Sequence, residues 1–138
     1  MSKDHERTQT LEALEGDIWP EPPAESTTLV KAVYRLRRRP VGELTAYELG
    51  RLIGQDVGLP WTLPLALEIL RETAPDQNDG GFYDDDLLSA VLTRRAETWT
   101  AHPDSARELR QILDALTDLS PYIQRDREKF LEAAQGID

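Results

Sequence analysis

The 138-residue sequence contains no cysteine. Disulfide bonds, thiolate metal ligands and thiol nucleophiles are therefore excluded, and the composition fits a reducing compartment. Histidine is nearly absent as well, with only His5 and His102. Neither has a partner at the spacing of a zinc site or of a catalytic relay. We therefore predict no metal site, no cofactor and no enzymatic activity.

Long hydrophobic runs are also missing. No window approaches the roughly 18 consecutive apolar residues of a membrane-spanning helix, and the start of the chain has no signal-peptide-like run. Positive charge is scarce, because 16 Lys and Arg face 26 Asp and Glu, for a net charge of −10. We expect a cytoplasmic protein that binds neither nucleic acid nor membrane. The charge favours a basic macromolecular partner, unless it serves solubility alone.

Apolar residues recur with helical spacing between turn-forming residues, and alternating β-branched runs are absent. This pattern predicts an all-α fold, a single compact bundle of about six or seven helices with short loops. We expect a flexible tail at residues 1–10 and one domain at residues 11–135. One or two helical turns are expected within residues 6–15, and the expected helices lie near residues 26–38, 45–54, 62–70, 84–92, 96–101, 104–116 and 121–131.

Residues 43–70 give the strongest local signals. Thr45 and Glu48 have the spacing of a capping box, which starts a helix that Gly54 or Gly58 ends. Thr62 is expected to open the next helix, with Pro64 in its first turn. That helix is apolar nearly all round, which predicts a buried position in the middle of the bundle. The apolar face expected for the preceding helix consists of Leu44, Tyr47, Leu49, Leu52 and Ile53.

The segment before Pro40 combines a proline-rich connector with a basic helix end. Trp19 in the connector is expected to plug the edge of the core. Ser26 is the expected N-cap of a helix whose buried stripe is Leu29, Val30, Val33 and Leu36. The arginines at its end are explained by the helix dipole, with a phosphate or acidic-partner site as the alternative; they are Arg35, Arg37, Arg38 and Arg39.

Residues 74–86 are expected to form a loop, with Asp84–Asp86 capping the next helix. The start of this loop has the spacing of a calcium-binding loop. The match fails, because the fifth position is Gly80 and the twelfth is Leu87, where a bidentate carboxylate is required. No P-loop, dinucleotide fingerprint or nucleophile elbow occurs anywhere in the chain.

Several uncommon elements in fixed order resemble the CdiI-family immunity proteins of bacterial contact-dependent growth inhibition (CDI) systems. The resemblance covers residues 11–102 and includes the segments LEALEGDIWPEPPAES, LIGQDVGLPWTLPLAL and FYDDDLLSAVL. A polar run before Tyr83 departs from the family pattern and indicates a loop of different length. The matching residues include Leu36, Arg37, Pro40, Leu44, Gln55, Gly58, Pro64, Asp86 and Trp99.

This resemblance implies a cytoplasmic protein that binds one cognate toxin domain and neutralises it stoichiometrically. Toxins of such systems are often nucleases, whose basic groove an acidic inhibitor would complement. The alternative function is an acidic helical adaptor for another basic protein. The candidate binding residues are Asp76, Asp79, Asp84, Asp85 and Asp86 with Tyr83 as the anchor, and Glu21 and Glu25 as second choice. Tyr83 and Asp86 could instead be a packed tyrosine and a helix cap.

Overall fold

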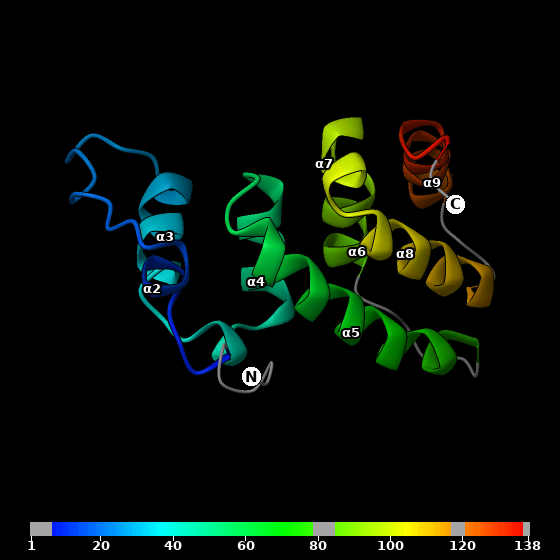
Figure 1. Ribbon diagram of the computed structural model, residues 1–138, viewed down its shortest axis with the longest axis horizontal. Helices are drawn as coiled ribbons and strands as arrows, with labels where there is room; N and C mark the ends of the chain where they lie inside the picture. The colour runs from blue at the N-terminus through cyan, green and yellow to red at the C-terminus, as the bar shows by residue number, and fades with distance from the viewer. Residues whose placement is uncertain (1–6, 79–84, 117–120, 137–138) are drawn as a thin grey trace.

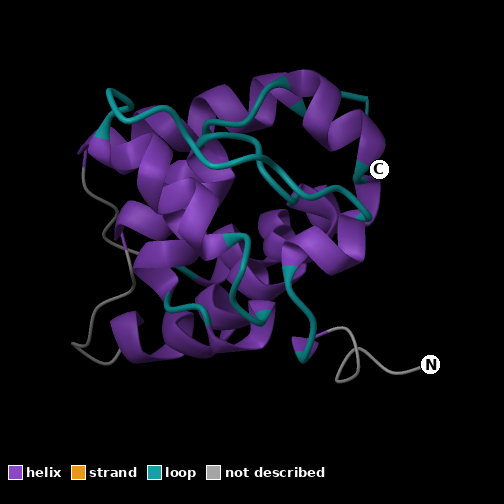
Figure 2. Cartoon of the chain, turned by 90° about the vertical axis from the view of Figure 1, so that its left-hand side faces the viewer, coloured by secondary structure: helices purple, strands orange, loops and turns teal. Residues whose placement is uncertain are grey.

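The computed structural model describes residues 7–78, 85–116 and 121–136, without the side chains of residues 73–78, 85, 86 and 122. These parts of the chain form eight α-helices and one 3-10 turn, and they contain no strand (Figure 2). The elements are α2 Leu11–Glu15, α3 Thr28–Leu36, η1 Val41–Glu43, α4 Ala46–Gly54, α5 Leu59–Asn78, α6 Asp85–Leu92, α7 Ala96–Ala101, α8 Pro103–Ala115 and α9 Pro121–Ala133. The predicted all-α class is therefore confirmed, with one helix more than expected.

Helix α4 occupies the middle of the structure (Figure 1). It packs against α3 on one side and against α5 and α6 on the other, while α8 lies on α5 and α9 packs on α6 and α7. The core is continuous across these contacts, because each of these helices contributes side chains with almost no exposed surface. They include Leu52 and Ile53 of α4, Leu63 and Leu67 of α5, Leu88 and Val91 of α6, Trp99 of α7, Leu109 of α8 and Phe130 of α9.

The predicted capping box opens α4. The Thr45 hydroxyl accepts a hydrogen bond from the Glu48 backbone N–H at 3.2 Å, and the Glu48 carboxylate accepts one from the Thr45 N–H at 2.9 Å. Arg39 donates to the same carboxylate at 2.7 Å. The Thr45 N–H, and then the charge of Arg39, lower the pKa of Glu48 below its ordinary value.

The turn between α4 and α5 needs two left-handed residues. After Gly54 the chain places Asp56 at φ 58° and then Gly58 at φ 64°. A Cβ at Gly58 would lie 2.7 Å from a methyl carbon of Leu11, so glycine is required there by sterics as well as by φ. Gly58 thus lets α2 pack closely on this turn.

Helix α5 differs from its prediction at both ends. It begins at Leu59, where Pro60 falls in the first turn and its missing N–H breaks no helical bond. Thr62 is a buried residue inside the helix, and its hydroxyl donates to the Gly58 carbonyl at 3.1 Å. The helix ends at Asn78, so residues 74–78 belong to it and not to a loop.

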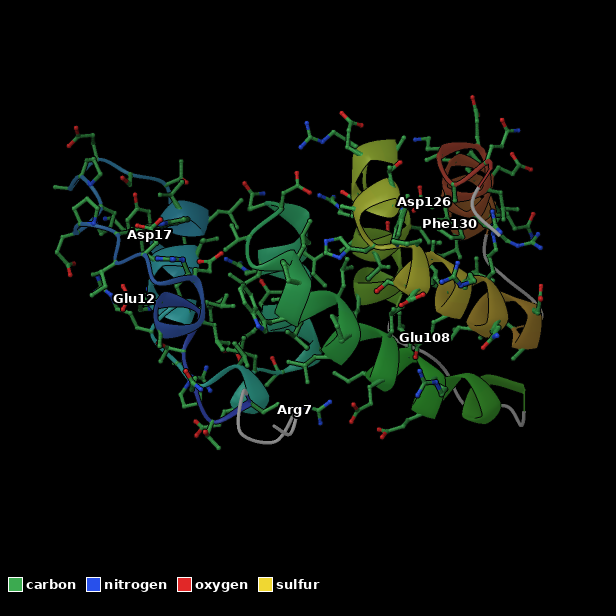
Figure 3. The ribbon with its side chains drawn as sticks, in the orientation of Figure 1. Arg7, Glu12, Asp17, Glu108, Asp126 and Phe130 are labelled. Atoms are coloured by element: carbon green, nitrogen blue, oxygen red, sulfur yellow. The ribbon has the colours of Figure 1, made fainter. Side chains whose placement is uncertain are left out.

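The expectation that α5 is buried on all sides is also wrong. One face is fully covered, but Leu65 and Ile69 are only half-buried, and Arg71 is exposed. Arg71 forms an ion pair with Glu108, which points from α8 toward α5 in Figure 3. Helix α5 therefore lies at the edge of the bundle, and α4 takes the central place.

Helix α3 confirms half of its predicted stripe. Its N-cap is Thr27 rather than Ser26, since the Thr27 hydroxyl accepts from the Val30 N–H at 3.2 Å. Val33 and Leu36 are buried, whereas Leu29 is 36% exposed and Val30 is 39% exposed. The first turn of α3 is therefore less covered than the rest of its apolar face.

The C-terminal half follows the predicted pattern. Leu87, Leu88, Val91 and Leu92 of α6 are completely buried, and α7 has the predicted bounds. The Trp99 and Phe130 rings meet edge to face with centroids 5.0 Å apart. Asp126 of α9, close to Phe130 in Figure 3, accepts a hydrogen bond from the Ser89 hydroxyl at 2.6 Å. These contacts join α9 to α6 and α7.

The described part of the expected tail contacts the bundle. Arg7 pairs with Glu68 of α5, the Gln9 carbonyl accepts from the Val41 N–H at 2.9 Å, and Thr10 forms an isolated bridge with Pro40. Within the described residues, none of the helices combines the length and the apolar character that crossing a membrane would require.

Candidate functional site

The acidic segment, residues 72–93, contains six carboxylates and no Lys or Arg, a charge of −6 within a chain of −10. It joins the end of α5 to α6. Asp76 lies near the end of α5, and Asp85 and Asp86 open α6, with side chains outside the description. Asp79, Tyr83 and Asp84 lie outside the described residues altogether. The structure therefore describes the two ends of the acidic segment, and Tyr83, the predicted anchor, lies outside the described residues.

The two second-choice carboxylates differ in their surroundings. Glu21 is exposed, and it accepts a hydrogen bond from the Arg38 guanidinium at 2.8 Å. Glu25 is exposed and forms no ion pair within the described part of the chain. Glu21 therefore helps to attach the connector to α3, and Glu25 is the more available charge.

Arg35 lies in the last turn of α3, where the helix-dipole explanation expects a cation, and the other three arginines form ion pairs within the protein. Arg37 is fully buried and donates to the Glu15 carboxylate at 2.5 Å and to the Asp17 carbonyl at 2.8 Å. Its guanidinium lies 3.9 Å from the ring centroid of Trp19, within the range of a cation–π contact. Trp19 is half-buried, as predicted for a plug at the core edge. Arg37 thus fixes the connector.

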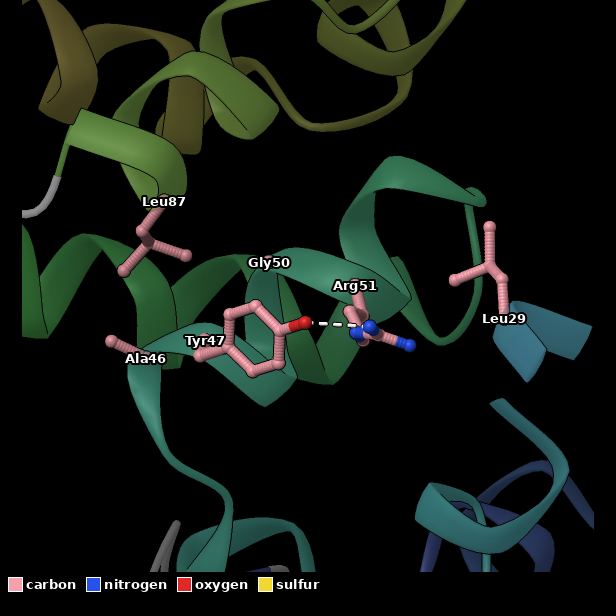
Figure 4. A pocket seen from close by; sticks show the side chains of 6 residues that line it. All are labelled: Leu29, Ala46, Tyr47, Gly50, Arg51 and Leu87. Atoms are coloured by element: carbon pink, nitrogen blue, oxygen red, sulfur yellow. Dashed lines mark hydrogen bonds between the residues drawn. The ribbon is translucent and has the colours of Figure 1, made fainter. Parts of the chain in front are cut away.

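A hollow of about 340 Å³ opens between α3 and α4, and we call it the α3–α4 hollow (Figure 4). Tyr47 stands at its rim and is 59% exposed. The Tyr47 hydroxyl accepts a hydrogen bond from Arg51, whose guanidinium lies 4.9 Å from the centre of the ring. The hollow is lined by Leu29, Ala46, Tyr47, Gly50, Arg51 and Leu87.

A second hollow of about 250 Å³ has Val30, the residue after Leu29, in its lining. Val30, Val33 and Tyr34 form its α3 side, and the Trp19 and Tyr34 rings meet with centroids 5.0 Å apart. Gln55 and Val57, from the turn after α4, complete it. Leu29 and Val30 are thus adjacent exposed apolar residues that line two neighbouring hollows.

The prediction that Tyr47 belongs to the buried face of α4 is wrong, and helix geometry gives the reason. At about 100° per residue, Tyr47 lies roughly 140° from Leu52 and 120° from Ile53. Gly50 and Arg51, three and four positions later, share its face instead. The spacing alone could have placed these three residues on an outward face, since the apolar character of Tyr47 was the only reason to put it inside.

Among the described residues, no three His, Asp or Glu side chains come together in a way that could hold a metal ion. The hollow itself contains one charged side chain, Arg51, surrounded mostly by apolar groups. Such a composition suits a protein contact, where tyrosine and arginine are enriched among the strongest binding residues.

Comparison with known proteins identifies the family. The family model described as CDI immunity proteins matches residues 13–109, from α2 into α8. No curated protein and no solved structure matches the chain. The matched region includes every residue of the α3–α4 hollow and the whole acidic segment. The chain therefore belongs to the family of CDI immunity proteins.

Proposed function

We propose that this protein binds the toxin domain of its own CDI system in the bacterial cytoplasm and neutralises it by stoichiometric contact. Membership of the immunity family is the observation that carries the proposal. The exposed Tyr47 beside an apolar hollow supports inhibition by contact. An acidic adaptor for some other basic protein is the alternative.

A nuclease is the toxin class that the charge favours. A nuclease exposes a basic groove for its substrate, and a protein of net charge −10 is attracted to such a groove. Electrostatic complementarity mainly accelerates association and rejects wrong partners, so the binding energy must come from a few buried contacts as well.

Co-expression with the C-terminal domain of the adjacent CDI toxin tests the function directly. We expect growth arrest by this domain to be relieved by the wild-type protein, and the purified pair to form a one-to-one complex. A toxin domain from an unrelated CDI system serves as the control and should remain toxic. Continued arrest with the cognate domain, despite soluble expression of both proteins, would contradict the proposal.

Charge reversal tests the acidic segment. The double substitution Asp84→Lys with Asp85→Lys should slow association with the toxin domain by about tenfold at low salt and flatten its salt dependence. Asp114→Lys with Glu128→Lys is the matched control, because it makes the same change in net charge at exposed positions on α8 and α9. Equal association rates for the two double variants would show that only total charge matters.

A further inference from the structure

We propose that the toxin domain docks on the α3–α4 hollow, with Tyr47 as the principal anchor and an apolar side chain of the toxin packed against its exposed ring. The proposal rests on the toxin-binding function above and names its surface. It places the main binding energy on α4.

The first argument is the exposure of apolar side chains. In the described part of the chain, the large exposed hydrophobic residues are Ile18, Leu29, Val30 and Tyr47, and two of these line the α3–α4 hollow. Leu29 lies in line with the buried residues of α3 but keeps 36% of its surface exposed. Burial of such side chains by a partner is favourable because it removes apolar surface from water.

The second argument is that Tyr47 is already held in place. The Arg51 guanidinium lies against its ring and donates to its hydroxyl, so both ends of the side chain have a contact within one helical turn (Figure 4). An exposed aromatic residue that is ordered before binding loses little side-chain entropy when a partner covers it. Tyr47 therefore has the properties of a preformed anchor.

The third argument is the glycine at the floor of the hollow. Gly50 lies in the middle of α4, where glycine is less favourable than alanine because it loses more conformational entropy on folding. Packing inside the protein does not require it, because a Cβ there would meet only Leu87 at 3.9 Å, an ordinary van der Waals distance. The missing side chain instead keeps the α3–α4 hollow open.

The position of the hollow favours a basic toxin domain as its occupant. Leu87, one of its lining residues, directly follows Asp85 and Asp86 at the start of α6. The apolar hollow thus lies next to the start of α6, which is the described end of a segment that carries −6 in the sequence without Lys or Arg. A partner with an apolar anchor beside basic side chains would complement both, as a polar rim around a buried centre does in protein interfaces.

Substitutions at Tyr47 test the anchor, with binding to the purified toxin domain measured by calorimetry. Tyr47→Ala should raise Kd by about 30-fold or more, whereas Tyr47→Phe, which keeps the ring, should stay within about threefold of wild type. Gln111→Ala, at an exposed position on α8, is the surface control and should leave Kd unchanged. Urea unfolding of each variant checks that the fold is retained.

Filling the hollow gives an independent test that leaves Tyr47 in place. Gly50→Ala should raise the urea midpoint slightly, and Gly50→Leu should reduce toxin affinity at least tenfold without lowering stability. If the wild type binds and neutralises the toxin while Tyr47→Ala and Gly50→Leu bind equally well, the docking site is wrong and the proposed function stands. If the wild type does not bind the toxin, the proposed function fails first.

Self-association is the remaining outcome. Sedimentation of the free protein, with and without Tyr47→Ala, reveals whether the α3–α4 hollow joins two copies of this chain. We expect a concentration-independent monomer in both cases. A dimer that Tyr47→Ala dissociates would overturn the proposal, since the hollow would then be filled before the toxin arrives.

Discussion

Arg37 is the residue whose surroundings differ most from what its chemistry suggests. Arginine is rarely fully buried, and a buried charge is costly unless it is paired. Here one nitrogen reaches both Glu15 and the Asp17 carbonyl, and Trp19 covers the guanidinium. These groups all come from α2 and the connector, so a single side chain, at the C-cap of α3, attaches both to the bundle.

Replacing Arg37 should therefore loosen this corner of the protein. Arg37→Met keeps much of the apolar volume but leaves Glu15 and the Asp17 carbonyl without their donor, and we expect the free energy of unfolding to fall by about 3 kcal/mol. Urea unfolding at pH 7 measures it. Arg35→Met, on the same helix at an exposed position, is the control and should cost less than about 0.5 kcal/mol. Similar losses for the two variants would contradict the assigned role.

At the scale of elements, the capped start of α4 was easier to predict than either end of α5. The capping box of α4 depends on two residues three positions apart, so local sequence contains the whole signal. Helix α5 continues past Leu70 through Pro75 to Asn78, although proline and asparagine favour a turn. Local preference was thus overridden in a helix that packs along α4, α6 and α8.

The capping box of α4 also predicts a pH dependence. Because the folded-state pKa of Glu48 is lowered, its carboxylate stabilises the protein at neutral pH, and this stability is lost as the pH falls from the ordinary glutamate pKa of about 4.3 through the lowered folded-state pKa. Glu48→Gln can still accept from the Thr45 N–H but has no charge for Arg39. The wild type should therefore exceed the variant in free energy of unfolding at pH 7, and this difference should shrink below about pH 4.

Urea titrations of both proteins between pH 7 and pH 3 measure this difference. Taking the difference removes the titration of the other carboxylates, which both proteins share. A gap that stays constant over the whole range would show that Glu48 acts through packing and not through its charge.

For the whole molecule, α9 is part of the fold although it lies beyond the family match. The match ends at residue 109, yet Ile123, Phe130 and Ala134 are completely buried. Phe130 packs edge to face on Trp99 of α7, which is inside the matched region. The C-terminal helix thus completes the core that the family region begins.

Removal of this contact should destabilise the entire bundle. Phe130→Ala leaves a cavity beside Trp99, and we expect a loss of about 3–5 kcal/mol in the free energy of unfolding, with one cooperative transition. Lys129→Ala, exposed on the same turn, is the matched control and should change little. If Phe130→Ala instead separates the transition into two steps, α9 folds as an independent unit.

The sequence by itself determined the helical class, most helix positions, the capping box, the family and the concentration of negative charge, because each depends on residues close together in the chain. Only the tertiary structure decided which apolar residues remain uncovered. Leu29 and Tyr47 are residue types that often lie in a core, but their burial depends on whether another element packs over them. Likewise, Arg37 is buried and holds the connector only because α2 and the connector pack against the end of α3 there.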